Sequence, residues 1–74
     1  MIIKVIEKCM HDASKNKYTG TRVVYYEVKG AGSLLDALSS YEENFDSDNV
    51  VSSNDSFSSE CLDSYVSSVA IDSE

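Results

Sequence analysis

Cys9 and His11 are the residues whose types best suit nucleophilic catalysis. They stand two positions apart, so in a strand a thiol and an imidazole would point to the same face. No orienting residue or oxyanion site accompanies them, and adding Cys61 gives only three soft ligands at a spacing unlike that of zinc sites. We therefore expect no catalysis, no metal and no cofactor. Cys9 and Cys61 are interpreted as small hydrophobic residues, and whether they meet in space stays open.

Two further segments have part of a binding pattern. Asp46-Ser47-Asp48-Asn49 is similar to the start of a calcium loop, but Val51 stands where that loop needs glycine and Phe57 where it needs an acid. Gly30-Ala31-Gly32 has two glycines before a predicted helix and is not a phosphate-binding loop. Both segments are therefore predicted to be turns.

The carboxylates show the clearest pattern, because charge is divided along the chain. The first 29 residues have six basic and three acidic residues, hence 6 − 3 = +3, and residues 30–74 have ten acids and no base, hence −10. The two parts add up to the net charge of −7. Such a surface repels nucleic acid and anionic membrane and attracts basic partners.

Two strands and a helix are predicted to position these residues. Residues 2–11 alternate in hydrophobicity, and residues 21–29 (TRVVYYEVK) have paired β-branched and aromatic residues, so the two segments are expected to pair antiparallel. Residues 12–20 form the polar turn between them. Ser33, three residues before Asp36, predicts a helix start, and apolar residues recur at helical spacing until about residue 45.

The C-terminal part allows two interpretations. Residues 46–56 have the composition of a flexible loop, and 72–74 are expected to fray. We expect a short helix near 56–63 followed by a strand near 65–71, with a single second helix as the alternative.

The expected fold is a single small α+β domain over residues 1–74. It consists of an antiparallel β-hairpin, with a third strand left open, packed on one or two α-helices. One helical layer covers only one face of a sheet, yet both predicted strands have apolar residues on both faces. The uncovered face, with Tyr25 and Ile6, is then expected to form a homodimer or bind a partner.

Location follows from the cysteines and the first residues. MIIKVIEKCM places Lys4, Glu7 and Lys8 inside its apolar run, so we expect no signal peptide, a cytoplasmic location and reduced thiols.

Residues 2–45 resemble compact phage or mobile-element proteins. The resemblance consists of size, of strand, extended turn and second strand, and of Ser-Leu-Leu-Asp-Ala-Leu (33–38) opening an amphipathic helix after a small-residue break. Such proteins include anti-CRISPR inhibitors and phage proteins that block host polymerases or restriction enzymes, and several are acidic and imitate DNA. The resemblance implies stoichiometric binding to a host protein in the host cytoplasm.

The predicted function is therefore a non-enzymatic acidic inhibitor that evades host defence. Carboxylates on a helix face and an adjoining loop can approach the spacing of nucleic-acid phosphates, so a basic groove of a larger protein would accept them. The predicted partner-binding residues are Asp36, Glu42, Glu43, Asp46, Asp48, Glu60 and Asp63, with Tyr25 and Tyr41 as anchors. The alternative is a small structural or assembly protein that dimerises through its exposed sheet face.

Overall fold

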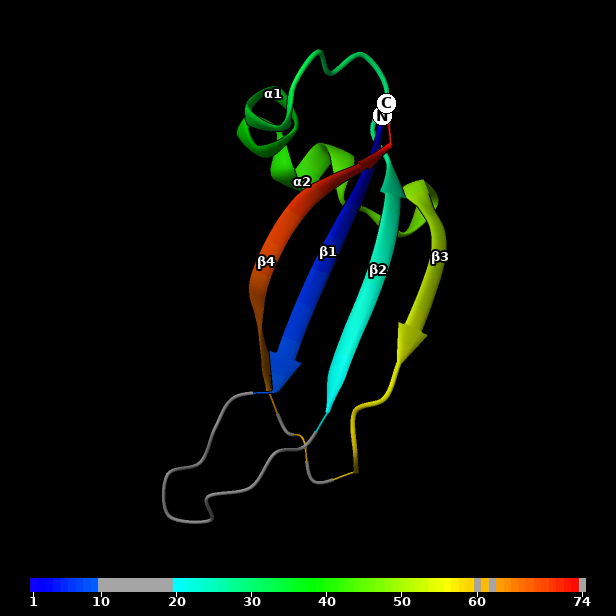
Figure 1. Cartoon of the computed structure of the whole chain (residues 1–74), viewed down its shortest axis with the longest axis vertical. Helices are drawn as coiled ribbons and strands as arrows, with labels where there is room; N and C mark the ends of the chain where they lie inside the picture. The colour runs from blue at the N-terminus through cyan, green and yellow to red at the C-terminus, as the bar shows by residue number, and fades with distance from the viewer. Residues whose placement is uncertain (10–19, 60, 62, 74) are drawn as a thin grey trace.

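A four-stranded antiparallel sheet forms the body of the protein. The structure is a computed structural model that describes residues 1–9, 20–59, 61 and 63–73. The strands are β1 (Ile2–Cys9), β2 (Thr21–Glu27), β3 (Val50–Asp55) and β4 (Ser64–Ser73), in the spatial order β3-β2-β1-β4 (Figure 1). This is a Greek-key order in which the connection from β2 to β3 contains the helices. The molecule measures 43 × 20 × 18 Å, and the helices lie at the end of the sheet where both termini are found.

The central pair, β1 and β2, confirms the predicted hairpin. Ile3 pairs with Tyr26 and Val5 with Val24, and these residues share one face. Lys4 pairs with Tyr25 and Ile6 with Val23, and these residues share the other face. The predicted turn at 12–20 lies, up to residue 19, outside the described residues.

The single helix predicted over residues 33–45 is wrong in length. The structure has α1 (Leu34–Ser39) and α2 (Tyr41–Asn44), which are separated at Ser40. The hydroxyls of Ser39 and Ser40 both donate to the carbonyl oxygen of Asp36, at 2.8 and 3.3 Å, and so compete for a carbonyl that would continue the helix. The predicted start is confirmed, because the Ser33 hydroxyl accepts the Asp36 backbone N–H at 3.2 Å.

The C-terminal part contains two strands rather than a helix and one strand. Residues 46–56, predicted as a loop, contain a 3₁₀ helix, η1 (Ser47–Asn49), and the strand β3. In the described residues of the 56–63 segment (56–59, 61 and 63), no helix forms, so that prediction is wrong. The alternative of a second helix is wrong too, because β4 pairs with β1 along its length and includes the predicted strand at 65–71.

The hydrophobic core lies between the helices and one face of the sheet. Ile3, Val5, Val28 and Ala37 are buried, and Leu34, Phe45 and Val69 pack against them. The ring of Phe45 stacks on Tyr26 with 5.0 Å between centroids. In the described part of the chain, every helical residue of this core packs on the face with Ile3 and Val5. The α+β class is therefore present, with a sheet larger and helices shorter than expected.

Cys9 and Cys61 form a disulfide, which corrects the prediction of reduced thiols. Their Cα atoms lie 5.7 Å apart although 52 positions separate them in sequence. The bond joins the end of β1 to the connection that runs from β3 to β4. The strand order explains how the two cysteines meet, because the connection from β3 to β4 crosses from one edge of the sheet to the other past the end of β1 (Figure 1).

Candidate functional site

Five of the predicted carboxylates belong to the helices and the 3₁₀ helix at one end of the molecule. Asp36 lies on α1, Glu42 and Glu43 lie on α2, and Asp46 and Asp48 lie at η1. All five residues are exposed. We call this set, Asp36, Glu42, Glu43, Asp46 and Asp48, the acidic end.

Local structure uses two of these carboxylates. Asp36 accepts the Gly32 backbone N–H at 3.3 Å, and Asp46 accepts the Asp48 backbone N–H at 2.8 Å, which caps η1. The side chains of Glu42 and Glu43 form no hydrogen bond or ion pair with another described residue. Their charges, and that of the Asp48 side chain, are therefore available to a partner.

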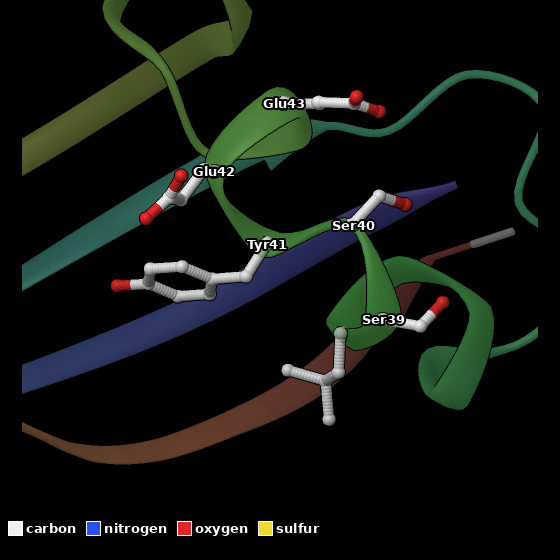
Figure 2. Close-up of a pocket in the computed structure, with 6 residues that line it drawn as sticks. Ser39, Ser40, Tyr41, Glu42 and Glu43 are labelled. Atoms are coloured by element: carbon white, nitrogen blue, oxygen red, sulfur yellow. The ribbon is translucent and has the colours of Figure 1, made fainter.

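Apolar side chains lie beside the acidic end. Leu38, Tyr41, Glu42 and Glu43 line an open hollow of about 510 Å³ together with Ser39 and Ser40. Leu38 is 39% exposed and Tyr41 43% exposed, although both belong to the stripe predicted to face the core. On α1 the buried residue is Ala37 instead. In Figure 2, the side chains of Tyr41 and Glu42 project to the same side of α2, and Glu43 projects to the other side.

The remaining predicted site residues lie elsewhere. Asp63 directly precedes β4, at the end of the sheet opposite the helices (Figure 1). Tyr25 is on the sheet face opposite Ile3 and Val5. Glu60 lies outside the described residues. The structure therefore brings together five carboxylates and Tyr41, and it places Asp63 and Tyr25 away from them.

A charged cluster that the sequence did not predict lies on the sheet. The Arg22 guanidinium contacts Asp55 at 3.0 Å and Glu7 at 3.5 Å, and its central carbon lies 4.8 Å from the centroid of the Phe57 ring. The Phe57 backbone N–H donates to Asp55 at 3.0 Å, and this bond, helped by Arg22, lowers the pKa of the Asp55 carboxyl. The cluster depends on strand register, which the sequence alone did not predict. Glu7 of β1 pairs with Arg22 of β2, and Arg22 pairs with Asp55 of β3.

Cys9 is oxidised in the disulfide and is not a free thiol, and His11 lies outside the described part of the chain. Within that part, no three His, Cys, Asp or Glu residues form a group able to hold a metal ion.

Comparison with known proteins adds no relative. The chain matches no protein-family model, no curated protein and no solved structure. None of the described helices has the length and apolar character needed to cross a membrane.

Proposed function

We propose that this protein is a non-enzymatic inhibitor whose acidic end binds a basic, nucleic-acid-binding surface of a larger host protein. The observation that carries the proposal is the concentration of five exposed carboxylates at one end of an elongated molecule. Glu42 and Glu43, without partners in the described residues, provide charge, and Leu38 and Tyr41 provide apolar contact beside it.

Electrostatics explains how this surface would compete with nucleic acid. A groove lined by lysine and arginine holds condensed anions, and a fixed set of carboxylates displaces them as a phosphate backbone does. Tyrosine and leucine then add contact area that is independent of salt. The resemblance to phage and mobile-element inhibitors, of the anti-CRISPR or anti-restriction type, agrees with a stoichiometric mode of action. Nucleic acid and anionic membrane are not proposed as partners, since the acidic end would repel both.

A cytoplasmic location, in a host cell if the protein comes from a phage, stays a prediction. The reduced thiols expected at that location are contradicted by the disulfide of Cys9 and Cys61, because disulfides persist mainly in oxidising compartments. An inhibitor that acts in the cytoplasm would have to fold with Cys9 and Cys61 reduced.

Capture from a cell lysate at two salt concentrations tests the proposal. The immobilised protein should retain a nucleic-acid-binding protein at about 50 mM salt and lose it by about 200 mM, a change of roughly tenfold or more in affinity. Duplex DNA added at low salt should displace the same protein. The double substitution Glu42→Gln/Glu43→Gln should abolish capture.

A matched control tests whether the position of a carboxylate matters or only the net charge of the protein. Asp63→Asn removes one carboxylate at the opposite end of the sheet and should leave capture unchanged, whereas Glu43→Gln alone should weaken it. Capture that is insensitive to salt, or that Asp63→Asn and Glu43→Gln weaken equally, would contradict the proposal.

A further inference from the structure

The sheet face opposite the core has no helix packed on it among the described residues. Ile2, Lys4, Ile6 and Lys8 of β1 point to this face, which we call the open face. The register adds neighbours from the flanking strands: Tyr25 beside Lys4, Val23 beside Ile6, and Tyr65 beside Lys8. Tyr65 is 46% exposed, and neighbouring exposed apolar side chains are typical of interaction surfaces.

A shallow hollow marks one end of the open face. It has a volume of about 360 Å³ and is lined by Ile2, Tyr25, Val51, Ser52 and Asp72. Val51 is 58% exposed, the second most exposed of the large hydrophobic residues described. The apolar part of the open face is therefore its centre, with Ile2 and Ile6 of β1 and Val23 and Tyr25 of β2, and the hollow leaves room for an inserted side chain. The outer strands add polar residues, Ser52 and Asn54 of β3 and Ser68 of β4.

The charged side chains at the two ends of the open face have opposite signs. At the end beside Ile2, the open face has two carboxylates. Glu27 of β2 pairs with Ile2, and Asp72 lines the same hollow as Ile2. Glu27 also lies 3.9 Å from the terminal ammonium group, whereas the Asp72 side chain makes no ion pair with a described residue. At the other end stands Lys8, which is exposed and likewise forms no ion pair with a described residue. The open face therefore has carboxylates at the end beside Ile2 and a lysine, Lys8, at the other end, with Lys4 between them.

We propose that two copies of this chain associate through their open faces, with the strands of one copy running antiparallel to those of the other. A two-fold axis across the middle of β1 places Ile2 of one copy over Lys8 of its partner, and Lys4 over Ile6. Lys8 of each copy then lies near Asp72 of the other copy, so this contact occurs twice in each dimer. A two-fold axis along β1 would give the parallel arrangement, with Lys8 over Lys8 and with Asp72 of β4 over the end of the partner's β2 that carries Glu27, so like charges select against it.

The area of the open face is sufficient for such a dimer. Four strands about 4.8 Å apart and eight residues of about 3.4 Å each give roughly 20 × 27 Å, or on the order of 500 Å² per copy. Two copies would bury about 1,000 Å², the lower limit for a specific interface. Two sheets packed at about 10 Å would enclose the apolar side chains of both open faces, as in a β-sandwich.

This inference does not depend on the proposed function. The acidic end lies with the helices on the core side of the sheet, so the dimer would leave it free. Failure of the dimer would not affect capture by Glu42 and Glu43, and failure of capture would not affect the dimer.

Zero-length cross-linking of lysine to carboxylate tests the geometry directly. Within one copy, Lys8 and Asp72 lie at opposite ends of β1, about 20 Å apart, so a direct amide bond between them can form only between copies. A mixture of ¹⁵N-labelled and unlabelled full-length protein, cross-linked with carbodiimide, should give a mixed-isotope peptide that joins Lys8 to Asp72. If Lys8 is joined only to carboxylates of its own copy, the arrangement is wrong.

Charge exchange provides the matched variants. Light scattering should give a mass of twice 8.1 kDa for the unmodified protein. Lys8→Glu should raise the dissociation constant about tenfold or more, and Lys8→Glu/Asp72→Lys should restore it. Glu43→Lys makes the same charge change as Asp72→Lys on α2 and should leave the dimer intact. A folded monomer at millimolar concentration, or no restoration in the double variant, would overturn the proposal.

Two apolar substitutions on the open face give an independent readout. Tyr25→Ser/Ile6→Ser should convert the dimer to monomer in light scattering while the far-ultraviolet circular dichroism stays that of the folded sheet. A double variant that remains a dimer would contradict association through this face.

Discussion

At the scale of single residues, Gly20 shows how closely the chain packs at the disulfide end of the sheet. Gly20 is buried and has a φ of 110°, and the connection after β3 passes over it. A Cβ at this position would collide with the Ser56 carbonyl oxygen and lie 2.8 Å from the Phe57 Cα. The obstacle is backbone, which is held by four hydrogen bonds between Ser56 and Thr21, at 2.9 to 3.4 Å.

Gly20→Ala should therefore destabilise the protein by about 2–4 kcal/mol, as the sum of backbone strain and overpacking. Gly30→Ala is the matched control, because Gly30 also has a positive φ of 78° but nothing lies within 4 Å of its added Cβ. The control should cost only the conformational strain, about 1 kcal/mol. Urea unfolding of both variants measures the difference, and equal midpoints would contradict the packing model.

Single residues also show where sequence reasoning ends. The Ser33 cap was predictable because it depends on residues three positions apart. The pairing of Cys9 with Cys61 and the contacts of Arg22 with Glu7 and Asp55 were not, because each joins residues that only the strand order brings together.

At the scale of elements, Asp55 fastens the end of β3. Its carboxylate accepts the Phe57 backbone N–H and the Arg22 side chain, which links β3 to β2 and to the connection that follows. These contacts lower the pKa of Asp55 below its ordinary value of 3.8. In the folded state the carboxyl therefore stays charged at a pH where the unfolded chain has bound a proton.

Stability contributed by Asp55 is present above the unfolded pKa and is lost as the pH falls through the lowered, folded pKa. We expect Asp55→Asn to be less stable than the unmodified protein at about pH 6, and the difference to shrink as the pH falls through the lowered pKa of the Asp55 carboxyl. Urea midpoints measured across this range give the comparison. A difference that is constant with pH would mean that the carboxylate charge has no part in holding β3.

The elements were predicted unequally well, for identifiable reasons. The pairing of β1 and β2 and the strand at 65–71 were readable from β-branched residues. β3 was not, because all six of its residues are exposed and four of them are polar, so no alternation marks it. Its backbone hydrogen bonds to β2 need no particular side chains. The helix break at Ser40 depends on two serine hydroxyls that helical periodicity does not take into account.

At the scale of the whole molecule, the disulfide constrains most of the chain. Cys9 and Cys61 enclose a loop of 52 positions, which should restrict the unfolded state enough to contribute about 4 kcal/mol to stability. Reduction, or Cys9→Ser/Cys61→Ser, should lower Tm by roughly 15–30 °C. Thermal unfolding with and without reductant measures this, and an unchanged Tm would show that the bond does not form in solution.

The acidic end was predicted in part at this scale. The separation of charge along the chain is visible in the sequence. Asp36, Glu42 and Glu43 lie on helices as expected, although on two short helices instead of one. The position of Asp63, far from the helices, depended on β4 crossing to the opposite edge of the sheet, which the sequence did not reveal.

The arrangement of β1, β4 and the disulfide also determines how the molecule would respond to a mechanical load. Ile2 pairs with Ser73, and β1 and β4 run antiparallel from this pair (Figure 1). A force pulling the termini apart would break the hydrogen bonds between these strands one after another, as a zipper opens, and at low force. The opening would stop at Cys9 and Cys61, where the covalent bond would take up the tension. We therefore expect β2, β3 and both helices, all enclosed between the two cysteines, to bear no load while the outer strand is peeled away.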